Sequence, residues 1–303
     1  MPETIKHYAQ SLYACPIVAL AGYTAAHQLP GPIYAYLDFG GATGSAKDGL
    51  AQGMLALAAQ KGKLAPGQTV LEAGGSTFAA ALTLAARAAG HPVTLAVPES
   101  LPAARQATLK RYGAKLVYSG ALYGRRGAEK LAAETAEKCG GYYVDYFCND
   151  GNPEYHRRTT GQAIVKAIGG EGPSLVDAVV VGVGSGGTIT GVGETIKAWT
   201  NDVRMVAVEP YESQAIGGGF VGKHSIPGIG AGFVPENYNP YVVDLVSAVS
   251  SGDAAQAARE VLLTDTVPAC ASAGAVLYAA RQLLEKGQSR AALCIFSGRQ
   301  IYE

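Results

Sequence analysis

Residues 179–191 read VVVGVGSGGTITG, and this stretch decides the fold class. Its first half is continuously apolar, which is typical of a strand in a parallel sheet that is covered on both faces. Small residues then follow from Gly184 to Gly187, and a helical run begins at Thr188. A buried strand, a glycine-rich turn and a helix in this order predict an α/β architecture.

The same alternation of short β-rich runs and alanine-rich helical runs extends along the chain. We predict strands at Tyr34–Phe39, Thr69–Glu72, Pro92–Pro98, Lys115–Ser119, Tyr142–Phe147, Ala178–Val183, Arg204–Glu209, Asp244–Val249 and Ala292–Phe296. We predict helices at Lys47–Gly62, Phe78–Ala89, Leu101–Tyr112, Gly127–Cys139, Glu154–Ile168 and Thr188–Trp199.

The length of 303 residues exceeds what a single core usually organises, about 250–300 residues, so we expect two domains. We place a smaller N-terminal α/β domain at residues 40–150 and a larger α/β domain at residues 1–39 together with 151–303. Each is expected to contain an open, mostly parallel twisted sheet covered by helices. In such folds ligands bind beyond the carboxyl ends of the strands, so the strand-to-helix turns are the candidate sites.

The composition argues against several classes of function. The chain is 48% hydrophobic and 16% charged, as folded globular proteins are. Lys+Arg and Asp+Glu are equal at 24 each and no basic run is present, so we expect no nucleic-acid partner. The start of the chain, MPETIKHYAQ, lacks the apolar segment of a signal peptide, and we expect no membrane segment. The five cysteines form no CxxC pair, which indicates reduced thiols in the cytoplasm and no metal site.

The turn from Gly184 to Thr188 has the properties of a phosphate site. Gly184, Gly186 and Gly187 leave backbone N–H groups accessible, and the positive end of the following helix favours an anion. The hydroxyl groups of Ser185 and Thr188 add further donors. A purely structural tight turn is the alternative interpretation.

The same turn satisfies the GxGxxG pattern of dinucleotide-binding proteins through Gly182, Gly184 and Gly187. Glu209 ends the next strand and lies about 20 residues further on, where an acid binds the ribose in that class of protein. An NAD-dependent oxidoreductase therefore stays open as an alternative.

A second turn, FGGATGSAKDG at residues 39–49, brings Lys47 to the start of a helix. An amine in this place lies at the positive end of the helix dipole, which favours its neutral, nucleophilic form. Taken alone, this turn is better explained by an ordinary surface lysine.

A third turn lies in LEAGGSTFAAALTLAARAAG, residues 71–90. Its small and hydroxyl residues Gly74, Gly75, Ser76 and Thr77 precede a helix, so the free N–H groups there suit a carboxylate. The alternative is that Ser76 or Thr77 only caps the helix.

A fourth turn, in the C-terminal CIFSGRQIYE, places Ser297 just after an apolar strand. One lysine, one phosphate turn, one carboxylate turn and one hydroxyl together predict pyridoxal phosphate and an amino-acid substrate. The lysine can bond the cofactor, the glycines can hold its phosphate, and a serine can meet its pyridine nitrogen.

The sequence resembles the cysteine synthase family nearly end to end. This is the β-family of pyridoxal-phosphate enzymes, which includes O-acetylserine sulfhydrylases and cystathionine β-synthases. CPIVAL (15–20) looks like the family's TPLVRL, TGSAKD (43–48) is similar to TGSxKD, and GVGSGGTITGVG (182–193) is similar to GTGTGGTITGVG. NPEYHRRTTGQAI (152–164) looks like NPxxHxxTTGPEI, and VEP (208–210), GIGAGFVP (228–235) and SAGA (272–275) match VEP, GIGAGFIP and SSGA. The C-terminal SGRQIY resembles SxRxY.

The resemblance implies fold-type II, the tryptophan synthase β-like arrangement of two domains, and a homodimer. It implies that Lys47 is the catalytic residue that carries the cofactor, that Gly184 to Thr188 bind the phosphate, and that Ser297 meets the pyridine nitrogen. It also implies substrate contacts, which we expect at Gly74, Gly75, Ser76, Thr77, Phe78, Tyr146 and Gly228, with Thr77 also contacting the cofactor.

The departures from the family pattern fall on substrate binding. The family's TSGNTG loop aligns with residues 74–79, GGSTFA, so its asparagine becomes Thr77. The family's glutamine before phenylalanine becomes Tyr146, and Asn-Pro before the lysine motif becomes Gly41-Ala42. We therefore predict β-replacement or β-elimination on a small β-substituted amino acid, with a small nucleophile, and leave the substrate open. A non-catalytic relative that only holds the cofactor is a second alternative.

Overall fold

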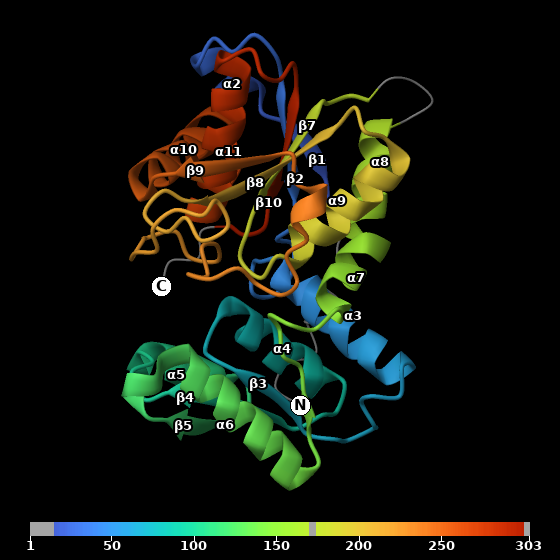
Figure 1. The fold of residues 1–303 in the computed structure, drawn as a ribbon, viewed down its shortest axis with the longest axis vertical. Coiled ribbons are helices and arrows are strands. Elements are labelled where there is room, and N and C mark those ends of the chain that lie inside the picture. Colours follow the sequence, from blue (N-terminus) through green and yellow to red (C-terminus); the bar gives the residue numbers. More distant parts are fainter. Residues whose placement is uncertain (1–14, 170–173, 300–303) are drawn as a thin grey trace. The chain divides into compact units, whose positions relative to one another are not determined.

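The structure is a computed structural model that describes residues 15–169 and 174–299 (Figure 1). Its contacts divide the described chain into a small unit, residues 40–151, and a large unit, residues 15–39 with 152–299. Each unit has its own sheet and its own covering helices. Residues 1–14, which we expected in the larger domain, lie outside the described residues.

The small unit contains a four-stranded parallel sheet in the order β5-β4-β3-β6. Its strands are β3 (Val70–Ala73), β4 (Val93–Pro98), β5 (Ala114–Ser119) and β6 (Tyr142–Tyr143). Its helices are α3 (Lys47–Gln60), α4 (Thr77–Ala88), α5 (Ala103–Arg111) and α6 (Gly124–Cys139), with the 3-10 turn η1 (Ala121–Tyr123). Helix α4 is buried along most of its length, which its many alanines allow because small side chains let neighbouring elements approach closely.

The predicted strand at Tyr142–Phe147 is too long. Strand β6 ends at Tyr143, and Asp145 adopts a left-handed backbone conformation with a φ of 54°. The N–H groups of Cys148 and Asn149 then donate to the carbonyl of Asp145 over 3.0 and 2.9 Å, which closes a turn. Tyr146 therefore lies on a turn rather than on a strand.

The large unit contains a six-stranded sheet in the order β1-β2-β10-β7-β8-β9, parallel except for β1. Its strands are β1 (Ile17–Ala19), β2 (Ile33–Leu37), β7 (Ala178–Gly182), β8 (Arg204–Pro210), β9 (Leu245–Val249) and β10 (Ala292–Phe296). Its helices are α2 (Ala21–Ala26), α7 (Gly151–Arg158), α8 (Thr160–Gly169), α9 (Gly187–Trp199), α10 (Ser251–Asp265) and α11 (Ala271–Glu285), with the 3-10 turn η2 (Pro240–Val242). The single helix predicted at Glu154–Ile168 is thus two helices, α7 and α8.

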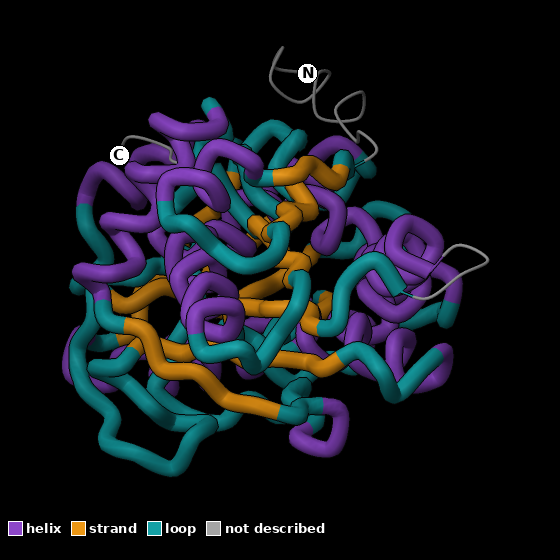
Figure 2. Tube along the Cα trace, turned by 90° about the horizontal axis from the view of Figure 1, so that it is seen from above, coloured by secondary structure: helices purple, strands orange, loops and turns teal. Residues whose placement is uncertain are grey.

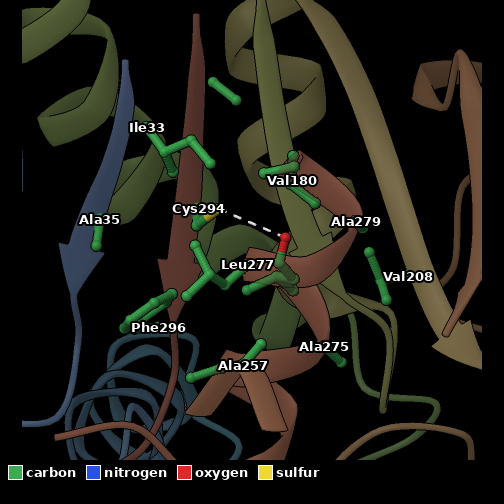
Figure 3. Close-up of a cluster of buried hydrophobic side chains, with 14 of the residues drawn as sticks. Ile33, Ala35, Val180, Val208, Ala257, Ala275, Leu277, Ala279, Cys294 and Phe296 are labelled. Atoms are coloured by element: carbon green, nitrogen blue, oxygen red, sulfur yellow. Dashed lines mark hydrogen bonds between the residues drawn. The ribbon is translucent and has the colours of Figure 1, made fainter. Parts of the chain in front are cut away.

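Helices cover the six-stranded sheet on both faces. Alternate side chains of each strand point to opposite faces and so pack against different helices. On one face, Val180 and Phe296 pack with Leu277 of α11 (Figure 3). On the other face, Val179 packs with Ile189 of α9. The strands drawn in orange in Figure 2 accordingly lie between helices drawn in purple. The continuously apolar sequence of β7 follows from this double coverage.

Cys294 lies at the centre of the first of these clusters and is fully buried. Its Sγ donates to the carbonyl of Val276 over 3.5 Å (Figure 3). Burial raises the pKa of this thiol, so Cys294 is a core residue and a poor nucleophile. None of the helices in the described ranges is both long and apolar enough to span a membrane.

Candidate active site

Lys47 is the first residue of α3, and the turn before it is closed by its own side chains. The hydroxyl of Ser45 accepts a hydrogen bond from the backbone N–H of Lys47 over 3.0 Å. The carboxylate of Asp48 accepts one from the N–H of Thr43 over 2.9 Å. A Cβ at Gly41 would collide with Asp48, so this position requires glycine. The motif TGSAKD thus folds into a rigid turn that presents the lysine at a helix N-terminus.

The turn after β3 leads into α4. Gly74 has a positive φ of 85°, and a Cβ at Gly75 would lie 2.7 Å from the side chain of Leu101. The hydroxyl of Ser76 accepts a hydrogen bond from the N–H of Ala79 over 3.3 Å, so Ser76 is the N-cap of the helix. The capping interpretation of Ser76 is therefore correct, and its O–H remains able to donate.

Phe78 and Tyr146 form a stacked pair beside Lys47. Their ring centroids are 4.0 Å apart with 17° between the planes, and the two side chains are 1% and 7% exposed. The Nζ of Lys47 lies 5.6 Å from the centroid of the Tyr146 ring, within the range of a cation–π contact. Three residues that the sequence placed at the site are therefore neighbours in the small unit.

Glu72 is a buried carboxylate at the end of β3 that the sequence did not assign to the site. Its oxygens accept hydrogen bonds from the N–H of Ala73 over 2.7 Å and of Tyr146 over 3.2 Å. Burial raises the pKa of Glu72 from 4.5 to about 8. Glu72 thereby links the start of the 74–78 turn to the turn that carries Tyr146. An acid at the end of an apolar strand was the available signal in the sequence.

The turn from Gly184 to Thr188 connects β7 to α9 in the large unit. A Cβ at Gly184 would collide with the carbonyl of Gly228, and Gly228 itself has a positive φ of 92°. Gly186 has a φ of 82°, and a Cβ there would lie 2.7 Å from the backbone nitrogen of Tyr238. Close backbone packing therefore requires both glycines, and the turn lies at the N-terminus of α9, where an anion such as a phosphate is favoured.

Two side chains of α7 contact the hydroxyl groups of this turn. The Nδ2 of Asn152 donates to the Oγ of Ser185 over 2.9 Å. The Nε2 of His156 lies 3.1 Å from the Oγ1 of Thr188. Asn152 and His156 belong to the segment 152–164 that carries the family resemblance, but the sequence assigned them no role. The signal was an Asn and a His four residues apart on one helix, which places them on the same face.

Glu209, the acid of the dinucleotide interpretation, is buried against the chain that follows it. Its two oxygens accept hydrogen bonds from the N–H groups of Ile216 and Gly217, both over 2.9 Å. Burial raises its pKa above the ordinary value. Glu209 and Gly184 line the same small hollow. Its carboxylate is occupied by backbone groups, which does not support a role in binding a ribose.

Ser297 follows β10, the strand that pairs with β7 in parallel. Because the carboxyl ends of parallel strands meet at one edge of a sheet, Ser297 and the turn from Gly184 to Thr188 lie at the same edge. The predicted site residues thus form two sets. Lys47, the turn at residues 74–78 and Tyr146 belong to the small unit, and the remaining ones belong to the large unit.

The comparison with protein families decides the identity of the chain. A family model described as "Pyridoxal-phosphate dependent enzyme" matches residues 10–298. The chain belongs to this family. Within the family it is similar to the cysteine synthase of Staphylococcus aureus (strain N315), with 34% identity over 250 residues, which are 82% of this chain and 80% of the relative.

Solved structures of the family have the same fold. The O-ureido-L-serine synthase matches with a TM-score of 0.88 and 28% identity, over 99% of this chain and 92% of that one. The cysteine synthase from Entamoeba histolytica matches with a TM-score of 0.87 and 28% identity, over 99% of this chain and 88% of that one. The predicted fold-type II architecture and membership of the cysteine synthase β-family are confirmed.

Membership of the pyridoxal-phosphate-dependent family also confirms the cofactor and the reaction class. The chain is an enzyme that uses pyridoxal phosphate to act at the β-carbon of an amino acid. The two alternatives, an NAD-dependent oxidoreductase and a non-catalytic relative, are not supported by these comparisons. Among the described residues, no group of three or more His, Cys, Asp or Glu side chains is arranged to hold a metal ion.

Proposed function

We propose that the chain catalyses β-replacement on a small β-substituted amino acid, with Lys47 as the residue that carries the cofactor. When bound, pyridoxal phosphate withdraws electrons from the α-carbon of the substrate and so promotes loss of a β-substituent. The observation that carries the proposal is the ordered turn 43–48, which presents Lys47 at a helix N-terminus in a chain that belongs to this family.

Three parts of the chain would have separate roles at the cofactor. The N–H groups and hydroxyls of Gly184, Ser185, Gly186, Gly187 and Thr188 would hold the cofactor's phosphate at the start of α9. Ser297 would meet its pyridine nitrogen with a neutral hydroxyl. The Nζ of Lys47, once released from the cofactor, would move the proton at Cα of the substrate.

The substrate would bind at the turn before α4. Gly74, Gly75, Ser76 and Thr77 offer N–H groups and hydroxyls to its carboxylate, although the family's asparagine is absent there. Gly228 stays a predicted substrate contact on the basis of the family resemblance alone. Phe78 and Tyr146 would line the substrate site with aromatic carbon, so we expect small and weakly polar β-substituents to be preferred.

The proposal is tested by trapping the cofactor. Borohydride treatment of the enzyme should leave the reduced cofactor covalently attached to the peptide that contains Lys47, as located by mass spectrometry. Lys47→Ala should give no attachment and no turnover, whereas the control Lys63→Ala, on an exposed position beyond α3, should behave as the wild type. Attachment at another lysine would overturn the assignment.

The substrate is identified by product analysis. A panel of amino acids with different β-substituents is incubated with sulfide, cysteine, homocysteine and amines, and the products are determined. A new β-substituted amino acid supports replacement, and release of keto acid and ammonia alone would show that elimination dominates.

We further propose a cytoplasmic homodimer, on the basis of the family resemblance. Sedimentation analysis of the purified enzyme tests the dimer.

A further inference from the structure

Both hydroxyls of the turn at residues 184–188 have a partner on the side of α7. Asn152 and His156 are 0% and 1% exposed, and they lie one helical turn apart on the same face of α7. The Nδ2 of Asn152 lies 2.9 Å from the Oγ of Ser185, and the Nε2 of His156 lies 3.1 Å from the Oγ1 of Thr188. Each of the two side chains therefore contacts one hydroxyl of the same turn.

The contact from Asn152 has a defined direction. Its Nδ2 can only donate, so the Oγ of Ser185 must accept and the proton of Ser185 is directed elsewhere. The orientation of the Asn152 side chain is set by close packing, because a Cβ at Gly187 would collide with its carboxamide. Gly187 is thus required for Asn152 to reach Ser185.

The contact from His156 has two possible directions, because the Nδ1 of the ring also lies 2.9 Å from the Oγ1 of Thr160. If Nε2 accepted, Thr188 would spend its only proton on the ring and could not donate to a phosphate. If Nε2 carries the proton, Thr160 donates to Nδ1, and the proton of Thr188 is left for a ligand. Only the second arrangement matches the direction of the contact from Asn152 to Ser185.

We infer that Asn152 and His156 are positioning residues of the cofactor site, each donating to a hydroxyl from behind so that Ser185 and Thr188 both donate to the phosphate. The inference rests on the proposed role of the turn in holding the cofactor. His156 then carries a proton on Nε2. With both hydroxyls donating beside the backbone N–H groups, the turn offers only donors, which suits a phosphate that carries no proton.

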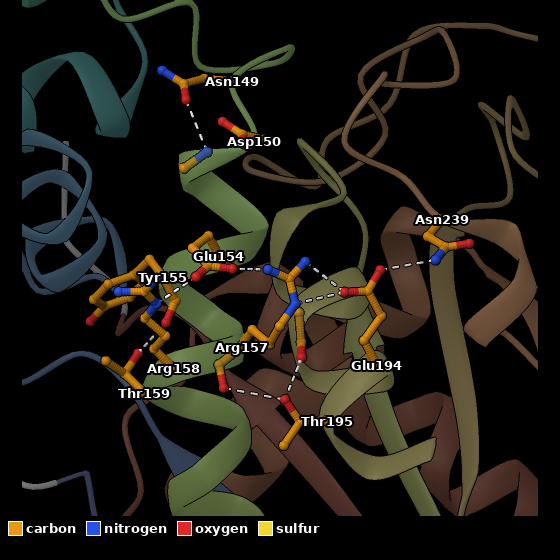
Figure 4. A network of polar contacts seen from close by, with 12 residues as sticks. Asn149, Asp150, Glu154, Tyr155, Arg157, Arg158, Thr159, Glu194, Thr195 and Asn239 are labelled. Atoms are coloured by element: carbon orange, nitrogen blue, oxygen red, sulfur yellow. Dashed lines mark hydrogen bonds and ion pairs between the residues drawn. The ribbon is translucent and has the colours of Figure 1, made fainter. Parts of the chain in front are cut away.

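Helix α7 is connected to α9 by side-chain contacts. Arg157 bonds to Glu154 on its own helix and donates from Nε to Glu194 of α9 over 2.8 Å (Figure 4). The hydroxyl of Thr195 on α9 shares its proton between the carbonyl of Gly191 on its own helix, over 2.8 Å, and the carbonyl of Arg157, over 3.2 Å. Helix α9 begins at Gly187, where the turn at residues 184–188 ends. These contacts therefore connect α7, which carries Asn152 and His156, to the helix that follows the turn.

The test compares the affinities of the cofactor-free enzyme for pyridoxal phosphate and for pyridoxal, which lacks the phosphate. Asn152→Asp replaces the donor by an acceptor, which turns the proton of Ser185 backwards. His156→Leu removes the donor to Thr188, and His156→Gln restores an amide N–H near the position of Nε2. Arg158→Gln, on the exposed side of α7, is the control.

We expect Asn152→Asp and His156→Leu to weaken pyridoxal phosphate binding by about 10-fold or more, since hydrogen bonds to a charged group are lost. Their affinity for pyridoxal should stay unchanged, and His156→Gln and Arg158→Gln should bind both compounds as the wild type does. His156→Leu should add little to Thr188→Val, because His156 is inferred to act only through the hydroxyl of Thr188. Thermal unfolding of each variant checks the fold.

Nitrogen NMR of the labelled enzyme should show the proton of His156 on Nε2. A proton on Nδ1 alone, or equal losses for pyridoxal and its phosphate, would overturn the inference. If His156→Leu does not fold, His156→Gln against His156→Asn replaces it, because the shorter amide cannot reach Thr188. Failure of the wild type to bind pyridoxal phosphate at these residues would refute the proposed function instead, so the two failures are distinguishable.

Discussion

The ring of Tyr146 lies almost parallel to that of Phe78, with the centroids 4.0 Å apart, and both rings are buried beside Lys47. The two residues replace polar positions of the cysteine synthase pattern. Because they contact one another, they are expected to act as a pair in stability and in the selection of substrates.

A double-mutant cycle tests the pair. We expect Tyr146→Leu and Phe78→Leu to show a coupling of about 1 kcal/mol in the free energy of unfolding, beyond the loss of buried area, because stacked rings attract one another. Tyr146→Phe keeps the ring and should be nearly as stable as the wild type. Tyr146→Leu should also change the relative kcat/KM values among β-substituted amino acids. A coupling near zero would contradict a specific stacking contribution.

The raised pKa of Glu72 is expected to make the free energy of unfolding depend on pH. Its pKa is about 8 in the folded protein against 4.5 ordinarily, so between these values the folded chain holds a proton that the unfolded chain has lost. The contribution of the protonated Glu72 side chain to the free energy of unfolding is complete below about pH 4.5. This contribution declines as the pH rises to about 8. At about 1.4 kcal/mol per pKa unit, the expected decline is a few kcal/mol.

Denaturant unfolding of the wild type and Glu72→Gln from pH 5 to 9, at one saturating cofactor concentration, measures this decline. The variant loses the titrating group, so the difference between the two proteins should shift in favour of Glu72→Gln as the pH rises. Glu137→Gln, on an exposed position of α6, should run parallel to the wild type. Parallel curves for Glu72→Gln as well would refute the assignment.

Gly187 is expected to tolerate no side chain. A Cβ there would displace Asn152 from Ser185, so Gly187→Ala should weaken pyridoxal phosphate binding by about 10-fold or more. Gly252→Ala in the first turn of α10 is the matched control, because its nearest neighbour would be the Oγ of Ser250 at 3.8 Å. We expect the control to be neutral or stabilised by roughly 0.5–1 kcal/mol. Cofactor titration and thermal unfolding measure both effects.

The ion pair between Arg157 and Glu194 is expected to contribute little in isolation. Both side chains are partly exposed, so a double-mutant cycle of Arg157→Gln and Glu194→Gln should give a coupling of about 1 kcal/mol or less, decreasing with salt. The pair Lys130 and Glu134 on the surface of α6, at 3.9 Å, should give a smaller value. A coupling insensitive to salt would show that packing rather than charge holds α7 to α9.

The strand-to-helix alternation could be predicted because it depends on local patterns. The apolar run before Gly184 needs double coverage, and the small residues after it need a turn, whatever the rest of the chain does. Strand β6 was predicted too long for the opposite reason. Residues 144–147 have the composition of a strand, but the N–H of Tyr146 bonds to Glu72, which is 74 residues away, and Asp145 turns the chain.

The sequence by itself determined the α/β class, the family, the cofactor and the candidate lysine Lys47, because each is written in contiguous residues. Only the tertiary structure decided which side chains from other elements contact the residues of those motifs. Asn152 reaches Ser185 across 33 positions and His156 reaches Thr188 across 32. The direction of such hydrogen bonds depends on where separate helices pack, and no local spacing in the sequence specifies it.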